Sequence, residues 1–125
     1  MATTAKILRI YVGENMKWKN QSLYRALLYK IKDAGLAGAT VIRGVEGFGQ
    51  LRAIHTARLL ELSADLPMVV ECIDYSDKID AIISEIKEMV PRGLIITSEV
   101  DVHNADQVWQ SDLPLYNEDY VNHVQ

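Results

Sequence analysis

Two segments of the chain repeat apolar residues every three or four positions, and short runs rich in β-branched residues lie on both sides of each. This repeat is typical of a helix that packs one face against a core, so we predict helices over Ser22–Ala34 and Ser76–Val90. The β-branched runs predict strands at Lys6–Val12, Ala39–Val45, Met68–Ile73 and Leu94–Val102. The resulting order is strand, helix, strand, strand, helix, strand, which is the order of the ferredoxin-like βαββαβ fold.

The ferredoxin-like order implies an α+β domain with a four-stranded antiparallel sheet and both helices on one face. The strand positions that point to the other face are also largely apolar, as Ile7 and Tyr11 show in the first strand. Large apolar surfaces are rarely left in water, so we expect this face to meet another subunit.

The chain of 125 residues is long enough for one domain with its own core. We assign this domain to residues 1–103, because the helix and strand periods stop there. Residues 104–125 have no lasting period but carry three large aromatic residues, Trp109, Tyr116 and Tyr120. We expect an extension that is either partly disordered or laid across a neighbouring subunit.

Composition disfavours several classes of protein. The net charge of −4 and the pI of about 5.3 argue against a dedicated nucleic-acid binder. The single cysteine, Cys72, excludes an internal disulfide and a multi-cysteine zinc site, and its apolar context favours a buried, inert thiol. No apolar run approaches the roughly 20 residues of a membrane-spanning helix, and no N-terminal signal-like segment is evident. We therefore expect a cytoplasmic protein without membrane insertion.

The stretch RGVEGFGQLRAIHT, residues 43–56, gathers groups that could hold a ligand. Its glycines let a ligand approach the main chain, and its arginines carry positive charge. Its histidine can donate a hydrogen bond near neutral pH, and its phenylalanine can stack on a base. Together these groups suit a phosphate-bearing ligand such as a nucleotide. The candidate residues are Arg43, Gly44, Gly47, Phe48, Gly49, Arg52 and His55.

The same stretch also has a purely structural interpretation. Glycines between two strands often form turns and bulges, and we expect Ala57–Leu62 to follow as an extended segment. The pattern lacks the Gly-Lys-Ser/Thr of a P-loop, and Arg52 stands where a dinucleotide-binding fingerprint has its third glycine. Sequence spacing alone leaves both interpretations open.

The sequence contains no set of residues that predicts catalysis, and we assign no catalytic residue. His55, His103 and His123 lack the spacing of metal ligands, so we expect neither a metal site nor a required cofactor. Arg92 and Gly93 follow the second predicted helix, where they either end that helix or close over a ligand.

Four segments of the sequence resemble one known family. They are LRIYVGE at Leu8–Glu14, GLAGATVIRGVEGFG at Gly35–Gly49, IHTARLLELSADLPMVVE at Ile54–Glu71 and RGLI at Arg92–Ile95. Over about Lys6–Val102 the chain resembles the PII-like family called domain of unknown function one-ninety. That family is similar in architecture to PII signalling proteins and to CutA proteins. The resemblance implies a ferredoxin-like subunit that assembles as a PII-type homotrimer.

PII proteins bind adenine nucleotides in clefts between subunits, and a loop between their second and third strands contacts a target, often a transporter or an enzyme. The resemblance places this loop at Glu46–Thr56 and the adjoining cleft wall at Pro91–Gly93. It therefore favours the ligand interpretation of the glycine-rich stretch. The loop is shorter than that of PII proteins and lacks their modified tyrosine. The residues expected to meet phosphates are Arg43, Arg52, His55 and Arg92.

Three functions remain as hypotheses from the sequence. The first is a non-enzymatic trimeric regulator that binds an adenine nucleotide, or a related phosphate ligand, and reorders Glu46–Thr56 in doing so. The second is a CutA-like metal-responsive protein, for which His55 and Cys72 are the candidate ligands. The third is a weak nucleotide hydrolase, although no carboxylate set for magnesium is evident.

Overall fold

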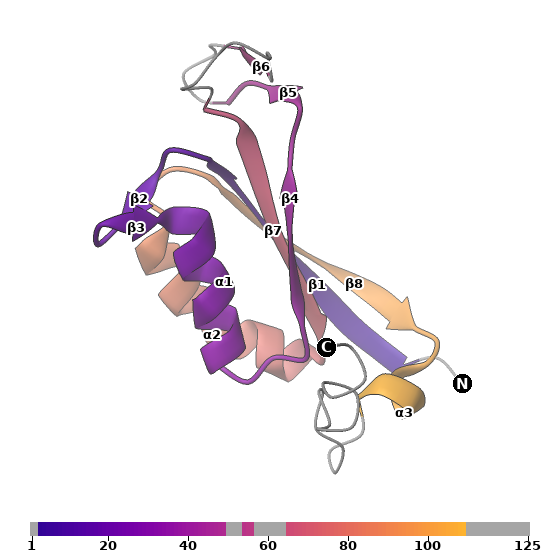
Figure 1. Ribbon diagram of the computed structural model, residues 1–125. Helices are drawn as coiled ribbons and strands as arrows, with labels where there is room; N and C mark the ends of the chain where they lie inside the picture. The colour runs from indigo at the N-terminus through magenta and orange to yellow at the C-terminus, as the bar shows by residue number, and fades with distance from the viewer. Residues whose placement is uncertain (1–2, 50–53, 57–64, 110–125) are drawn as a thin grey trace, which may run out of the picture.

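The computed structural model describes residues 3–49, 54–56 and 65–109. Its centre is a four-stranded antiparallel sheet with the strand order β4-β7-β1-β8 (Figure 1). The predicted α+β class and the antiparallel sheet are confirmed. The sheet strands are β1 (Thr3–Gly13), β4 (Ala39–Arg43), β7 (Pro67–Asp74) and β8 (Leu94–Val102), and the long helices are α1 (Leu23–Asp33) and α2 (Ser76–Met89).

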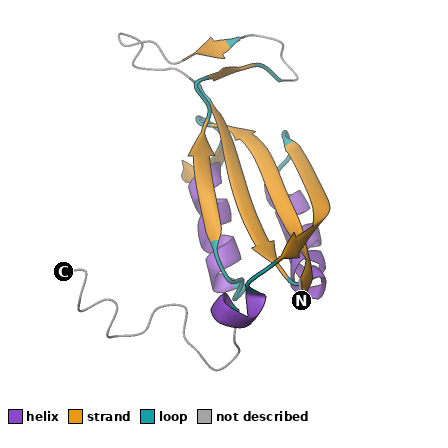
Figure 2. Cartoon of the chain, turned by 90° about the vertical axis from the view of Figure 1, so that its right-hand side faces the viewer, coloured by secondary structure: helices purple, strands orange, loops and turns teal. Residues whose placement is uncertain are grey.

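Both long helices cover the same face of the sheet, and among the described residues no long helix lies on the other face (Figure 2). The strands alternate accordingly, since β7 is buried at every second residue from Met68 to Asp74. Leu8 and Ile10 of β1 are fully buried between the helices and the sheet. The helices contribute the apolar residues that the 3.6-residue repeat predicted, among them Leu27, Ile31, Ile79 and Ile86.

The segment between β1 and α1 is polar in sequence but contains regular structure. It contains a short hairpin of β2 (Lys17–Trp18) and β3 (Gln21–Ser22). Lys19 and Asn20 both have positive φ angles, as a tight hairpin turn requires. Ser22 precedes α1, and its side chain makes no capping hydrogen bond. Gly35 takes a left-handed conformation after α1, with φ of +83°.

The chain after β8 forms a short helix, α3 (Ala105–Val108), which the sequence pattern did not predict. It lies at the end of the sheet where β8 finishes, on the side away from the long helices (Figure 2). Ala105 is buried, and the Trp109 ring meets Tyr75 edge-on, with 5.1 Å between ring centroids. These contacts fix the start of the segment after residue 103 against the domain. Tyr116 and Tyr120 lie outside the described residues.

One carboxylate, Asp74, is buried at the same end of the sheet. Its Oδ2 accepts a hydrogen bond from the Ala37 N–H at 2.8 Å, and its Oδ1 accepts one from the Tyr75 N–H at 2.7 Å. Asp74 therefore joins the loop after α1 to the start of α2. A buried charge is tolerated here because both of its oxygens have N–H donors.

We predict that Asp74→Asn lowers the free energy of unfolding by about 2 kcal/mol, because the amide NH₂ then faces an N–H that needs an acceptor. Urea unfolding measures this difference. The matched control is Asp101→Asn, since Asp101 is exposed on β8. Equal stability of the two variants would show that the Asp74 carboxylate does not secure this junction.

Candidate functional site

The residues singled out in the sequence gather at the end of the sheet where β1 and β4 finish and β7 and β8 begin (Figure 1). Beyond this end projects an arm made of β5 (Glu46–Gly47) and β6 (His55–Thr56), which pair antiparallel. The arm connects β4 to β7, so its two roots lie next to each other in the sheet. This confirms neither of the two interpretations of the stretch, but it locates the stretch outside the core.

Arg43, the last residue of β4, forms an ion pair with Glu14, which follows β1. The two strands are not neighbours, because β7 lies between them. The register places Arg43 beside Met68 and Met68 beside Val12, so the ion pair spans three strand ends. The Arg43 side chain is 59% exposed and the Glu14 side chain 19%, so the arginine keeps much of its contact with solvent although its guanidinium is paired.

Gly44 and Gly47 lie against Pro67, the first residue of β7. A Cβ atom on Gly44 would stand 2.7 Å from Pro67 Cγ, and one on Gly47 would stand 3.1 Å from the same atom. The Gly44 N–H also donates to the Pro67 carbonyl oxygen at 2.7 Å. The lack of a side chain at these two positions therefore allows the roots of the arm to pack closely.

The other edge of the sheet carries the second expected part of the site, Arg92 and Gly93. Gly93 has a φ of +151°, and a Cβ there would stand 2.5 Å from the Tyr11 carbonyl oxygen. Arg92 is exposed and makes no ion pair within the described part of the chain. Because β4 and β8 are opposite edges, three strand spacings of about 4.8 Å, roughly 14 Å, separate the edge strand that ends at Arg43 from the edge strand that follows Arg92.

The remaining candidate residues belong to the arm. A Cβ atom on Gly49 would have open space around it, with no atom beyond the chain neighbours within 4 Å, and Phe48 is largely exposed. The backbone of His55 pairs with that of Gly47. Arg52 and the expected extended segment Ala57–Leu62 lie outside the described residues. The ligand roles of all nine candidates thus remain predictions.

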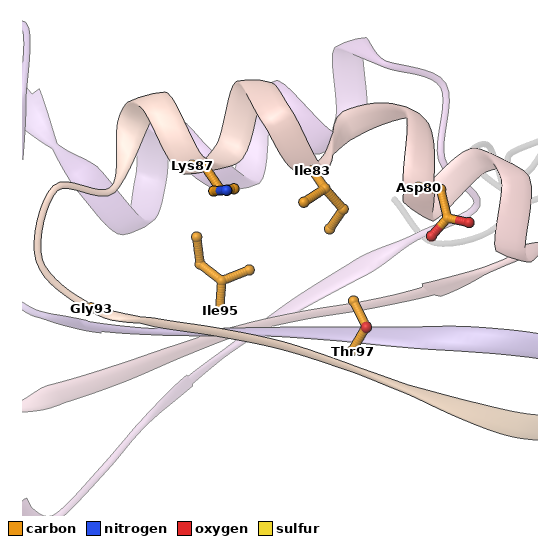
Figure 3. A pocket seen from close by; sticks show the side chains of 6 residues that line it. All are labelled: Asp80, Ile83, Lys87, Gly93, Ile95 and Thr97. Carbon is orange, nitrogen blue, oxygen red and sulfur yellow. The ribbon is translucent and has the colours of Figure 1, made fainter.

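A groove of about 610 Å³ lies between α2 and the edge strand β8 (Figure 3). Ile83 of α2 and Ile95 of β8 supply apolar walls, and Lys87 supplies positive charge. At the far end Asp80 binds the Lys6 ammonium at 2.7 Å, so its carboxylate is already engaged. The groove begins at Gly93, and sequence reasoning missed it because no motif marks a space between a helix and a strand edge.

The face of the sheet without long helices has an apolar surface that includes one ion pair. Tyr11, Ile42 and Leu94 are 38%, 48% and 58% exposed, respectively. Arg9 and Glu71 stand opposite each other on β1 and β7, and Arg9 Nε donates to Glu71 Oε2 at 2.8 Å. This hydrogen bond raises the pKa of Arg9. The expected exposed apolar surface is therefore present toward the arm, whereas Ile7, on the same face of β1, is buried.

Cys72 lies on the helix-covered face of β7 and is buried. Burial, followed by the nearby charges of Asp74 and Glu71, raises the pKa of its thiol to about 12. Within residues 3–49, 54–56 and 65–109, no three His, Cys, Asp or Glu side chains cluster as metal ligands would. No helix among the described residues has the length and apolar character needed to cross a membrane.

The fold defines the class of protein, because solved structures of PII-like proteins superpose on it. CPII from Thiomonas intermedia K12, described as a nitrogen regulatory PII-like protein bound to ADP, AMP and bicarbonate, matches with a TM-score of 0.63 at 12% identity, covering 82% of this chain and 91% of CPII. A candidate PII-like signaling protein from Thermus thermophilus also reaches 0.63 at 14% identity, covering 86% of this chain and 97% of its own. The chain has a PII-like fold.

Sequence comparison then gives the family. The family model DUF190, described as an uncharacterized ACR, matches residues 5–102, and the chain belongs to this family. A UPF0166 protein of Aquifex aeolicus is 39% identical over 97 residues, covering 78% of this chain and 91% of its own length. A UPF0166 protein of Methanocaldococcus jannaschii is 32% identical over 103 residues, covering 82% and 94%. The resemblance noted from the sequence is confirmed.

We predict that Gly93→Ala destabilises the protein by about 2–3 kcal/mol, because its Cβ would overlap the Tyr11 carbonyl at a φ that favours glycine. Thermal unfolding measures the change. Gly38→Ala is the matched control, since a Cβ at Gly38 meets nothing within 4 Å. A Gly93→Ala variant as stable as Gly38→Ala would contradict the close approach of this junction to β1.

We predict that the Cys72 thiol in the folded protein does not react with a disulfide reagent at about pH 8, and that urea exposes it to rapid reaction. Its raised pKa adds stability below pH 9, the ordinary thiol value, and this stability is lost as the pH rises toward about 12. Between about pH 8 and pH 10.5 the urea midpoint should therefore fall less for Cys72→Ala than for the wild type. An equal fall of the urea midpoint in Cys72→Ala and in the wild type would show that the pKa of the Cys72 thiol is not raised in the folded protein.

Proposed function

We propose that the protein is a non-enzymatic PII-like regulator that assembles as a homotrimer and binds an adenine nucleotide, or a related phosphate ligand, between its subunits. The observation that carries this proposal is the position of Arg43 and Arg92 at one end of the sheet but on opposite edges. In a head-to-tail ring, the β4 edge of one copy approaches the β8 edge of the next. The two cations, on edge strands about 14 Å apart in one subunit, would then share one cleft.

The apolar face of the sheet supports the assembly. Tyr11 and Leu94 are direct neighbours across β1 and β8, and both are exposed in the single chain. Ile42 on the β4 edge extends the same face. Contact between such faces of three copies would remove this surface from water, at roughly 25 cal/mol of stabilisation for each Å² of apolar area.

The ligand class is supported by the cations and by the neighbouring structures. The protein carries a net charge of −4, yet Arg92 and Lys87 flank Gly93 and the groove without ion pairs inside the described ranges. A nucleotide combines an anionic end with a flat base, and the groove combines Lys87 with apolar walls at Ile83 and Ile95. CPII, which has a similar fold, is described as bound to ADP and AMP.

The arm supplies the output in this proposal. It projects from the sheet next to Arg43, and Val45 and Ile54 in it are exposed. Ligand binding would change the arrangement of Glu46–Thr56 and thereby the surface offered to a target protein such as a transporter or an enzyme. Such a switch requires the ligand to bind the two arrangements with different affinity. We keep residues 104–125 as a proposed C-terminal extension, and the contact of Trp109 with Tyr75 holds its start at the opposite end of the sheet.

Calorimetry with ADP, AMP and ATP tests the proposal, with the trimer verified by sedimentation. We expect binding by at least one nucleotide and a loss of about tenfold in affinity for Arg92→Ala, as for one hydrogen bond to a charged group. Lys78→Ala is the control, because Lys78 is exposed in the first turn of α2 at the opposite end of the sheet.

Two results would contradict the proposal. One is the absence of heat with every nucleotide although the trimer is intact. The other is an equal loss of affinity for Arg92→Ala and Lys78→Ala, since this would indicate a general charge effect rather than a site beside Gly93.

A further inference from the structure

The ion pair of Glu14 and Arg43 joins both roots of the arm. Arg43 is the residue before Gly44, where the chain leaves the sheet for the arm. Where the chain returns from the arm to β7, the Leu66 carbonyl oxygen accepts a hydrogen bond from the Glu14 N–H at 2.8 Å. The next amide, that of Asn15, donates to Asp65 Oδ1, also at 2.8 Å. We call these three interactions the clasp.

The clasp is built around an arginine that an anionic ligand would need. Glu14 Oε2 contacts one terminal nitrogen of the Arg43 guanidinium, and its side chain is well shielded from solvent. Phosphate and carboxylate oxygens bind a guanidinium through the same N–H groups, so they compete for it. A phosphate that binds both terminal nitrogens of the Arg43 guanidinium must displace the Glu14 carboxylate. The displaced carboxylate then stays as an unpaired negative charge beside the phosphate.

We propose that Glu14 sets the affinity of this protein for its anionic ligand, by competing with the phosphate for Arg43 and thereby coupling ligand binding to release of the arm. The proposal rests on the proposed function, because it takes Arg43 as a phosphate contact. It adds a residue outside the expected site and a physical route from ligand to arm. When the phosphate holds Arg43, the ion-pair link between the two roots of the arm is gone.

The backbone contacts explain why this exchange reaches the arm. The Gly44 N–H lies directly after Arg43 and donates to the Pro67 carbonyl oxygen at 2.7 Å. Glu14 is held by its own backbone to Leu66, the residue before Pro67. Loss of the ion pair between Arg43 and Glu14 therefore leaves these backbone contacts to hold the roots, so that the arm can change its angle to the sheet more easily without altering the core.

The effect on affinity follows from the population of the open clasp. If the ligand binds only when Arg43 is released, its apparent association constant equals the intrinsic association constant multiplied by the fraction of molecules in which the clasp is open. The ion pair is partly exposed, so it holds the clasp closed only modestly. Removing the carboxylate charge should then tighten ligand binding about two- to fivefold.

Glu14→Gln tests the proposal, because it keeps the size of the side chain and removes its charge. With ADP as the probe in calorimetry, we expect the variant to bind about two to five times more tightly than the wild type, with a smaller difference at high salt. Glu99→Gln is the matched control. It makes the same charge change on β8 beside Lys6, about 20 Å along the sheet from Gly93, and should leave the affinity unchanged.

A double-mutant cycle separates competition from an indirect effect. In a background of Arg43→Gln, Glu14→Gln should give no further gain in affinity, because the residue it competes for is absent. If the gain persists in that background, or if Glu14→Gln binds ADP no more tightly than Glu99→Gln, the proposal is overturned. Should Glu14→Gln fold poorly, Glu14→Asp replaces it, because the shorter side chain loses its reach to Arg43.

Hydrogen exchange without ligand tests the clasp independently of nucleotide binding. Glu14→Gln should increase exchange of the Gly44 amide, while amides of β1 within the sheet stay protected. If the wild-type trimer binds no nucleotide, the proposed function fails. The exchange experiment then still tests whether Glu14 holds the root of the arm. Unchanged protection of the Gly44 amide in Glu14→Gln would show that it does not.

Discussion

The pairing of β1 with strands on both sides is the constraint on which the rest of the structure depends. Strand β1 is antiparallel to β7 along eight residue pairs and to β8 along nine. This double pairing, with β4 added beside β7, brings the ends of β1 and β4 and the starts of β7 and β8 to one end of the sheet. It also leaves β4 and β8 as opposite edges, so that Arg43 and Arg92 stand on opposite sides of one sheet end.

Carboxylates secure both ends of this sheet, but in different ways. Asp74 is buried and accepts two backbone N–H groups, so its charge is compensated by fixed donors that keep α1, α2 and β7 together. Glu14 is only partly buried and faces an exposed cation that other anions can bind. The first arrangement is suited to stability and the second to exchange of partners, because a guanidinium on an exposed side chain can change partner without moving the backbone of the core.

The candidate site could be predicted from the sequence only in part. The glycine-rich stretch and Arg92 stood out by residue type, and topology brings them to one end of the sheet. The reason for two of the glycines was hidden, since Gly44 and Gly47 pack on Pro67, which lies far beyond them in the chain in a separate strand. Glu14 appeared only as the last residue of a segment that resembles the family, with nothing to indicate its partner. It follows the first strand and Arg43 ends the second long one, and only the order β4-β7-β1 brings the two side chains together.

The sequence by itself determined the order of the four sheet strands and two long helices and the apolar face of each helix, because local periodicity records these properties directly. Membership of the family followed instead from the resemblance of four segments of the chain to that family. Tertiary structure alone decided the partners of the charged side chains: Glu14 for Arg43, backbone amides for Asp74, and Lys6 for Asp80. The physical reason is that a charge carries no information about its partner until folding brings residues that are distant in the chain within a few ångströms of it.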